Sequence, residues 1–400
     1  MFFWQEEFEF PEALSQSLVQ ALWECEHADK IDARKISATA ATLQNLWTKL
    51  ALKRGQERGQ GRDAHYSFDS KMTHAYAAYY LPANLLKVYA VLEEMRLLGI
   101  DLSQNSLSWL DVGCGPGTAL WGASWWMNSQ NSGAGKLEYV GVDQSLNFTG
   151  LGSRLARTAR FSAEWKTPKK MSAKVLAEIF QDKKSDVVSF VNSIAEIEAD
   201  VPARTAFTKA LVDEMNSEAV RLGKTKWLIF IEPGSKNSSR ELHQLREMLR
   251  TDPRVKIWLP CLSGRACGAY EKPEDWCHED ISCKFPEWMN ELGAAASLKK
   301  ESMLFSYLVC SVGVHPEVLG WPDEGQRVVS QRIQEKGLTR CFVCTKNGRK
   351  GARLIHSRAN ENNEKFLQLV RGGIFTKLEL DEKSSVLDLI VHSHKDNSTI

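Results

Sequence analysis

The stretch WLDVGCGPGTALWG, residues 109–122, has the pattern of a buried strand, a glycine-rich turn and the start of a helix. Gly113, Gly115 and Gly117 let the main chain bend tightly and let a ligand approach it closely. The N-terminus of the following helix favours an anionic or polar group at the turn. We therefore expect a ligand-binding βα unit, with a plain βα turn as the alternative.

Short apolar runs around this turn alternate with helical or polar stretches. The runs are LSWLDVG, LEYVGVD, DVVSFVN and KWLIFIEPG. Such alternation predicts an α/β fold, a parallel sheet with crossover helices. The first 99 residues carry long helical patterns instead, and Pro82 should bend or restart the last of these helices. Residues beyond Trp321 form short β-rich runs.

Three regions follow from these changes of pattern. At 400 residues the chain is long enough for more than one domain. We expect a helical N-terminal region over 1–99, an α/β domain over 100–320 with a cysteine-rich insertion at 259–290, and a small β-rich C-terminal region over 321–400.

Charge and hydropathy restrict the class of protein. The chain has 51 Lys and Arg against 50 Asp and Glu, so any case for nucleic-acid binding must be local. The opening MFFWQEEFEF is acidic, unlike a secretory or transit peptide. No run approaches the roughly 20 apolar residues of a membrane span. We expect a cytoplasmic protein without a membrane contact, in which structural disulfides are rare.

Acidic residues accompany the glycine turn. Asp111 precedes the glycines, and Thr118 stands where a dinucleotide fingerprint would have its third glycine. Asp143 ends the next apolar run. A carboxylate suits a vicinal diol, because it can accept both hydroxyl protons.

Cysteines gather in a second part of the sequence. The spacing of Cys261, Cys267 and Cys277 is wider than the usual C-x₂₋₄-C of structural zinc sites. This spacing favours a larger metal centre, such as an iron–sulfur cluster. His278 could be a ligand or support one, and a zinc site stays the alternative. A redox pair is disfavoured because no C-x₂-C adjoins a βαβ unit. The remaining thiols are Cys283, the C-x₂-C pair Cys341 and Cys344, and three that we interpret as buried hydrophobes, Cys25, Cys114 and Cys310.

The order of motifs from about residue 65 to 360 resembles that of a known family. In order they are AYAAYYLPANLLKVYAVLEEM, LDVGCGPGTALW, IFIEPG, PC…C…WCH, FSYLVCS and a late C…NGR. This order is similar to that of the methyltransferase-like small-subunit ribosome assembly proteins, whose mitochondrial members accompany the maturing small ribosomal subunit. The resemblance implies a Rossmann-like class I methyltransferase domain. It also implies S-adenosylmethionine at Asp111, Gly113, Gly115, Gly117 and Asp143.

The same resemblance implies a metal centre. In that family four cysteines hold a [4Fe-4S] cluster, and the matching positions here are Cys261, Cys267, Cys277 and Cys344. Cys283 and Cys341 depart from the pattern, which leaves the fourth ligand and a zinc alternative open.

Catalysis is less clearly indicated than cofactor binding. Asn192 follows its strand without the prolines of an Asn/Asp-Pro-Pro-aromatic motif, so no catalytic residue is assigned. Basic runs at Lys49–Arg62 and Lys346–Arg358 suit phosphate contacts, with ordinary solvated surface as the alternative. In the second run we expect Arg349, Lys350 and Arg353 to face RNA.

These observations together predict an S-adenosylmethionine-binding, iron–sulfur factor of assembly or translation that acts on the small ribosomal subunit and its rRNA, with no DNA partner expected. The alternatives are an active rRNA methyltransferase and a zinc-stapled RNA-binding protein with a vestigial cofactor pocket.

Overall fold

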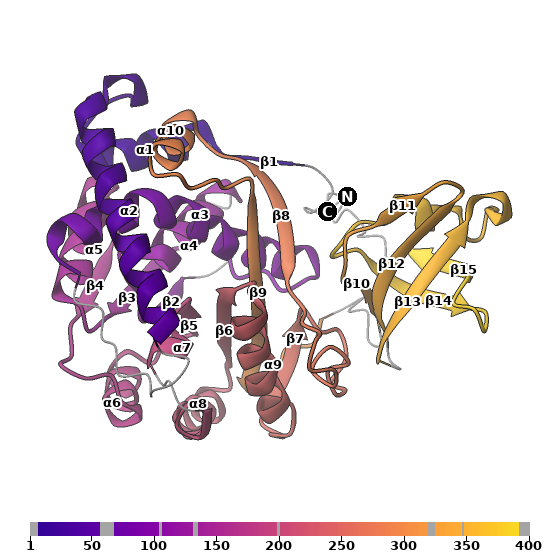
Figure 1. Ribbon diagram of the computed structural model, residues 1–400. Coiled ribbons are helices and arrows are strands. Elements are labelled where there is room, and N and C mark those ends of the chain that lie inside the picture. Colours follow the sequence, from indigo (N-terminus) through magenta and orange to yellow (C-terminus); the bar gives the residue numbers. More distant parts are fainter. Residues whose placement is uncertain are drawn as a thin grey trace.

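The computed structural model contains a mixed α/β domain and a separate β unit (Figure 1). It describes residues 7–56, 68–103, 106–130, 135–197, 201–318, 325–345 and 348–391, with side chains omitted for 47–56. No helix in these ranges is long and apolar enough to cross a membrane.

Five parallel strands form the centre of the α/β domain, in the order β4-β3-β2-β5-β6. They are β2 (Leu107–Val112), β3 (Leu137–Val142), β4 (Ala163–Lys166), β5 (Val187–Val191) and β6 (Thr225–Pro233). The chain starts in the middle of the sheet, proceeds to β4, and returns to the other side at β5. The order therefore reverses between β2 and β5, and ligands of open α/β sheets bind beyond the carboxyl ends of the strands at such a point.

Antiparallel pairing extends the sheet beyond β6. β9 (Ser302–Gly313) runs antiparallel to β6, and its other edge is shared by β7 (Val255–Leu259) and β8 (Glu279–Lys284). The segment between β7 and β8 leaves the sheet where one strand replaces the other. β1 (Phe8–Glu9) adds to β8. The order β4-β3-β2-β5-β6-β9-β7 is that of a Rossmann-like class I methyltransferase, which confirms the expected fold class.

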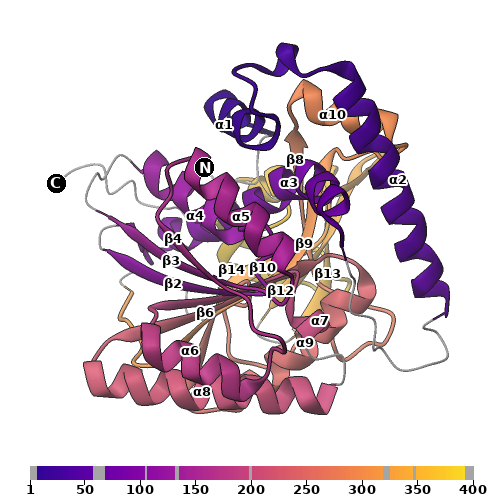
Figure 2. The ribbon, with the colours of Figure 1, turned by 90° about the vertical axis from the view of Figure 1, so that its left-hand side faces the viewer.

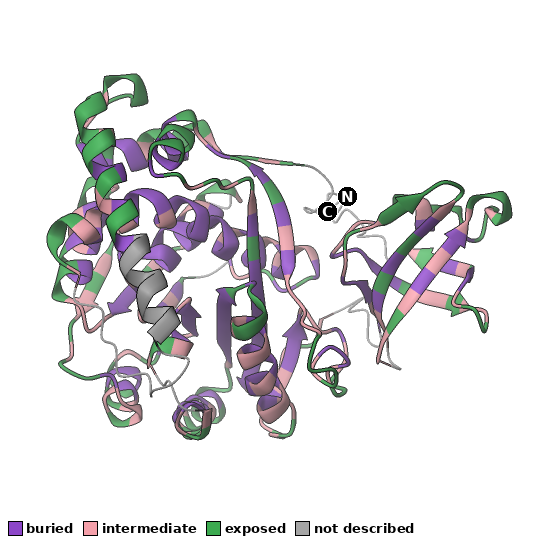
Figure 3. Ribbon diagram, viewed as in Figure 1, coloured by how far each residue is buried: buried purple, intermediate pink, exposed green. Residues whose placement is uncertain are grey.

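Helices cover both faces of this sheet (Figure 2). Because both faces are covered, β5 is buried along its whole length, as Figure 3 shows for the central strands. One layer contains α3 (Ser70–Leu97), α4 (Thr118–Ser129) and α5 (Leu146–Thr158); the other contains α6 (Ala173–Lys183), α8 (Val201–Leu222) and α9 (Lys236–Arg250). The helices α1 (Glu12–Trp23), α2 (Ala33–Gln56) and α10 (Glu287–Ala295) pack outside α3, and the short α7 (Ile194–Ile197) follows β5.

The helix α3 does not restart at Pro82, one of the two outcomes expected there. It is continuous through Pro82, which is buried inside it. Packing explains the difference, because α4 approaches α3 closely at Gly122. A Cβ atom there would lie 2.5 Å from the carbonyl oxygen of Leu85 and 2.7 Å from Cβ of Val88. A buried contact of this kind offsets the hydrogen bond that Pro82 cannot donate.

The C-terminal unit is a twisted six-stranded sheet with its own apolar core. Its strands are β10 (Gln326–Val328), β11 (Ile333–Glu335), β12 (Leu338–Thr345), β13 (Gly348–Ile355), β14 (Ile374–Leu380) and β15 (Val386–Val391). β12 and β13 form an antiparallel hairpin, and residues 346–347 between them lie outside the described residues.

Candidate functional site

The glycine turn lies at the carboxyl end of β2, next to the point where the strand order reverses. Gly113, Gly115 and Gly117 have φ values of 71°, 53° and 90°, which glycine adopts most readily. A Cβ atom at Gly113 would lie 2.4 Å from Cβ of Ser193, whereas a Cβ at Gly115 would meet nothing within 4 Å. The loop is thus closely packed at its start and open at Gly115.

Asp143 joins this loop to the end of β3. Its Oδ2 accepts a hydrogen bond from the amide of Gly115 at 2.9 Å, and its Oδ1 accepts one from the amide of Ser145 at 2.8 Å. Burial raises the pKa of the carboxyl group. Each oxygen keeps a second lone pair, so the half-buried carboxylate can still accept hydroxyl protons from a diol.

Asp111 lies deeper than Asp143. Its oxygens accept hydrogen bonds from Ser189 Oγ at 2.6 Å and Tyr139 Oη at 2.7 Å, and burial raises its pKa to about 6. These contacts are inside the core. Asp111 therefore positions the junction of β2 and the loop, and a direct contact with the cofactor stays a prediction.

A polar cluster near the carboxyl ends of β5 and β6 contains Asn192, which the sequence analysis singled out, and Glu232 and Lys87, which it did not. Glu232 is buried, and its Oε1 accepts hydrogen bonds from the amides of Ser193 and Ile194 at 3.1 and 3.2 Å. Burial raises its pKa to about 8 and lowers the pKa of buried Lys87 to about 7. Asn192 has a φ of 57°, and its buried Oδ1 lacks a hydrogen-bond partner among the described residues. The sequence feature that could have pointed to Glu232 is its position inside the apolar run IFIEPG.

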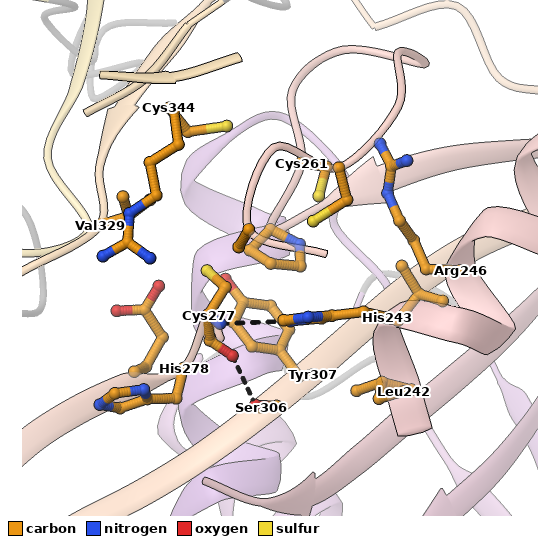
Figure 4. Close-up of a pocket in the computed structure, with 16 residues that line it drawn as sticks. Leu242, His243, Arg246, Cys261, Cys277, His278, Ser306, Tyr307, Val329 and Cys344 are labelled. Atoms are coloured by element: carbon orange, nitrogen blue, oxygen red, sulfur yellow. Dashed lines mark hydrogen bonds between the residues drawn. The ribbon is translucent and has the colours of Figure 1, made fainter. Parts of the chain in front are cut away.

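Four cysteines line one pocket between the α/β domain and the C-terminal unit (Figure 4). Cys261 follows β7 and Cys277 precedes β8, so both belong to the segment that leaves the sheet, as does Cys267. Cys344 comes from β12 on the opposite side. The pocket encloses about 630 Å³ between atoms, part of it open to solvent. The structure thus brings together the four thiols assigned as ligands.

The two extra thiols point elsewhere. Cys341 and Cys344 lie three residues apart on β12, so they face opposite sides of the strand. Cys341 is buried in the apolar core of the C-terminal unit, and Cys283 is buried in the core of the α/β domain. Neither lines the pocket.

Burial disfavours the thiolate form of three of the four pocket thiols. It raises the pKa of Cys267 to about 11 and of Cys344 to about 12, and it raises the pKa of Cys277 strongly. Burial opposes the charge of Arg246, but Cys261 and Glu247 raise its pKa overall. A metal would therefore have to displace thiol protons, and Arg246 could offset the charge of the resulting thiolates.

Histidines adjoin the thiols. His243 Nε2 accepts a hydrogen bond from the amide of Cys277 at 3.3 Å, and burial lowers the pKa of His243 to about 4. The buried Nδ1 atoms of His243 and His278 lack hydrogen-bond partners in the part of the chain that is described. Over the same ranges, no three His, Cys, Asp or Glu side chains are grouped tightly enough to hold a metal ion. The predicted metal site is therefore not confirmed.

A buried charge network next to the pocket was not predicted. Arg327 of β10 donates to Glu94 of α3 at 2.5 Å and to Tyr307 Oη at 3.2 Å, and it lies 3.4 Å from Glu279 of β8. Tyr307 also donates to Glu94. All four side chains are buried. The network attaches the C-terminal unit to the α/β domain. The sequence could not indicate it, because Arg327 is a single Arg in the run GQRVV.

The basic hairpin differs in part from expectation. Arg349 pairs with Asp275 of the cysteine segment and donates to the carbonyl of Trp276, and 14% of its side chain is exposed. It therefore anchors β13 to that segment instead of facing phosphate, whereas Lys350 is exposed. The other predicted basic run, Lys49–Arg62, has no described side chains.

Comparison with known proteins identifies the family. The family described as mitochondrial small ribosomal subunit Rsm22 matches residues 70–368. The chain belongs to the Rsm22 family. Its description associates Rsm22 proteins with the small ribosomal subunit of mitochondria, so the expected cytoplasmic location is not confirmed. No curated protein matches the chain.

Among solved structures, this Rsm22-family chain is similar to methyltransferases. One is a putative class I S-adenosylmethionine-dependent methyltransferase from Listeria monocytogenes (14% identity, 77% of this chain and 92% of that chain, TM-score 0.34). Another is the plantazolicin methyltransferase BamL, solved with S-adenosylhomocysteine (12% identity, 70% and 98%, TM-score 0.36). A third is a putative O-methyltransferase from Klebsiella pneumoniae (10% identity, 75% and 96%, TM-score 0.31).

Proposed function

We propose that this Rsm22-family protein is an S-adenosylmethionine-binding factor that acts on the small ribosomal subunit and carries a [4Fe-4S] cluster on Cys261, Cys267, Cys277 and Cys344. The observation that supports it best is the pocket in which these four thiols meet. Family membership supports the ribosomal partner. Whether this chain transfers a methyl group is a separate question.

The glycine loop supports the cofactor. Gly115 leaves open space beside the main chain, and Asp143 presents a carboxylate at the end of the neighbouring strand. The loop precedes the N-terminus of α4, which favours the polar amino-acid end of the ligand. Asp143 would then accept the ribose hydroxyls.

The composition of the pocket supports the cluster. Four thiols form the ligand set that iron–sulfur clusters use. Beside them lie two histidine nitrogens that have no hydrogen-bond partner within the described ranges. When bound, the group would link the cysteine segment to the C-terminal unit through metal–sulfur bonds. Cys277 and Cys344 are far apart in sequence, so this link would add to that of Arg327.

Anaerobic purification followed by iron, sulfide and zinc analysis tests the cluster. We expect iron and sulfide in similar amounts and a broad visible absorption that oxygen bleaches. Stoichiometric zinc without sulfide would contradict the cluster and favour the zinc-stapled alternative. Cosedimentation with isolated small subunits tests the partner, with large subunits as control; absence of selective sedimentation would contradict the ribosomal assignment.

One observation favours rRNA methylation as a second candidate function. Asn192 holds a buried oxygen without a hydrogen-bond partner in the described part of the chain. It lies near the carboxyl end of β5, the sheet end at which substrates of open α/β sheets bind. Transfer of labelled methyl from S-adenosylmethionine to small-subunit rRNA tests it. Label that appears with wild type and is lost with Asn192→Ala supports catalysis, and its absence with wild type leaves the factor non-enzymatic.

A further inference from the structure

The C-terminal unit closes into a small barrel. β10 and β11 pair with the same edge of β12, so together they form one interrupted first strand. The order is then β13, β12, β10 with β11, β14 and β15. A parallel bridge from Arg353 to Ser385, with the amide of Arg353 donating to the carbonyl of Ser384 at 2.9 Å, connects β15 back to β13.

This closure gives the strand order of a five-stranded OB barrel. In that order the third and fifth strands are parallel neighbours, and the first strand lies between the second and fourth, as here. The inside is filled by apolar side chains such as Val343, Leu354 and Phe375. OB barrels bind oligonucleotides or oligosaccharides on the face of strands two and three, here β12 and β13. A fold alone does not determine function, so the case for a ligand on this face depends on the residues that it carries.

The outer face of β12 and β13 carries an exposed aromatic ring with no side chain opposite. Phe342 is 47% exposed, and its cross-strand partner is Gly351. A Cβ atom at Gly351 would meet nothing within 4 Å. The guanidinium of Arg349 lies 4.8 Å from the ring centroid. A glycine inside a strand weakens the strand and often marks a close approach by a ligand.

Two like charges on this face are placed where their repulsion destabilises the sheet. Arg340 and Arg353 are directly opposite each other, and like charges in such pairs are destabilising. Glu335 pairs with Arg340 at 2.6 Å. Arg353 Nε has no hydrogen-bond partner among described residues, and its acidic neighbour is Asp381, whose pKa is lowered mainly by Ser385 and in part by Arg353.

Positive charge is concentrated in this unit as a whole. Residues 325–391 contain thirteen Lys and Arg against seven Asp and Glu, an excess of six, whereas the entire chain has a net charge of +1. The sequence of the hairpin, 338–355, contains no acidic residue. Such an excess on one unit favours a polyanionic ligand.

We propose that the outer face of β12 and β13 binds single-stranded RNA, with a base stacked on Phe342 and the backbone phosphates near Arg340 and Arg353. Stacking on an exposed ring requires an unpaired base, which excludes a regular duplex. The ion pair between Arg349 and Asp275 covers the end of the face near Cys344. The bound RNA would therefore leave the face past Arg340. Only the choice of RNA over DNA rests on the proposed function.

The test uses the full-length protein and a fluorescent, unstructured oligouridine of about twelve nucleotides, within the roughly 4–16 that an OB barrel covers. Fluorescence anisotropy measures affinity for wild type, Phe342→Ala, Phe342→Trp and Arg353→Ala. Leu387→Ala on β15 is the matched control, because Leu387 is an apolar side chain of similar exposure on another part of the barrel. Thermal melting verifies that each variant is folded.

We expect Phe342→Ala to weaken binding roughly ten-fold or more, and Phe342→Trp and Leu387→Ala to retain it. Arg353→Ala should reduce the slope of log affinity against log salt by about 0.7. If wild type does not bind the oligonucleotide, or if folded Phe342→Ala binds as wild type does, the proposal is wrong. Equal affinity for the annealed duplex would overturn it too. These outcomes are independent of sedimentation with the small subunit, which tests the proposed function.

Discussion

The carboxylate of Asp143 accepts a hydrogen bond from the amide of Gly115 at 2.9 Å. This contact joins the turn after β2 to the end of β3, the two places where the predicted cofactor-binding residues lie. The acid is therefore part of the loop's structure as well as a candidate ligand group, and the two roles can be separated by substitution.

S-adenosylmethionine should bind wild type and bind Asp143→Ala ten- to hundred-fold more weakly. Loss of a charge-assisted hydrogen-bonding group costs about 1.5–3 kcal/mol. Asp143→Asn keeps one acceptor oxygen and should lie between the two. Isothermal calorimetry measures the affinities, with exposed Asp182→Ala as the control. Equal binding by wild type and Asp143→Ala would place the ribose elsewhere.

Iron content should distinguish the pocket cysteines from the core cysteines. We expect Cys261→Ser, Cys267→Ser, Cys277→Ser and Cys344→Ser each to lose iron after anaerobic purification. Cys341→Ala is the matched control for Cys344, since it lies on the same strand but in the barrel core and should retain iron. Cys283→Ala should retain it too. Retention by Cys344→Ser together with loss in Cys341→Ala would show that the fourth ligand is misassigned.

Replacement of Arg327 should destabilise the protein much more than replacement of an exposed arginine. Arg327→Met leaves Glu94 and Glu279 buried without the arginine that pairs with both, and breaking a buried ion pair costs about 3–5 kcal/mol. Arg221→Met removes a pair between the exposed Arg221 and the half-buried Glu218 and should cost about 1 kcal/mol or less. Urea denaturation measures both free energies of unfolding. Similar values for the two variants would refute the structural role of the network.

Glu232 should make folding less favourable as the pH rises. Burial raises its pKa to about 8 from an ordinary value of 4.5, so the folded state binds the proton more tightly than the unfolded state. Its contribution is fully present below about pH 4.5 and is lost as the pH rises through about 8, a change on the order of 3–5 kcal/mol.

Glu232→Gln tests this sign directly. The amide keeps an oxygen for the hydrogen bonds from Ser193 and Ile194 but does not titrate. The stability of wild type relative to this variant, measured by urea unfolding at pH 5 and pH 8, should fall between the two values. Comparison at each pH cancels the contributions of titrating groups that do not interact with Glu232; Lys87, whose pKa Glu232 raises, is not among them. A constant difference would mean that Glu232 is ionised throughout.

Local pattern was sufficient for four of the five parallel strands but not for β4 or for the antiparallel strand β8. β2, β3, β5 and β6 are apolar runs that are mostly buried, and the glycine turn follows β2 directly. The sequence did not predict β8, because one of its inward-facing residues is the charged Glu279. Arg327 of the C-terminal unit compensates that charge in the folded protein. β4 is a short edge strand with half-buried side chains and a correspondingly weak alternation.

The sequence by itself determined the α/β order, the glycine turn with Asp143, and the set of cysteines from which a metal site could be built. Tertiary structure alone decided that Cys344 enters the pocket while Cys341 enters the barrel core, that Arg349 is engaged by Asp275, and that β15 returns to β13. The physical reason is the range of the interactions. Strand and turn preferences act between near neighbours, whereas strand register, burial and ion pairing depend on residues that only the folded chain brings together.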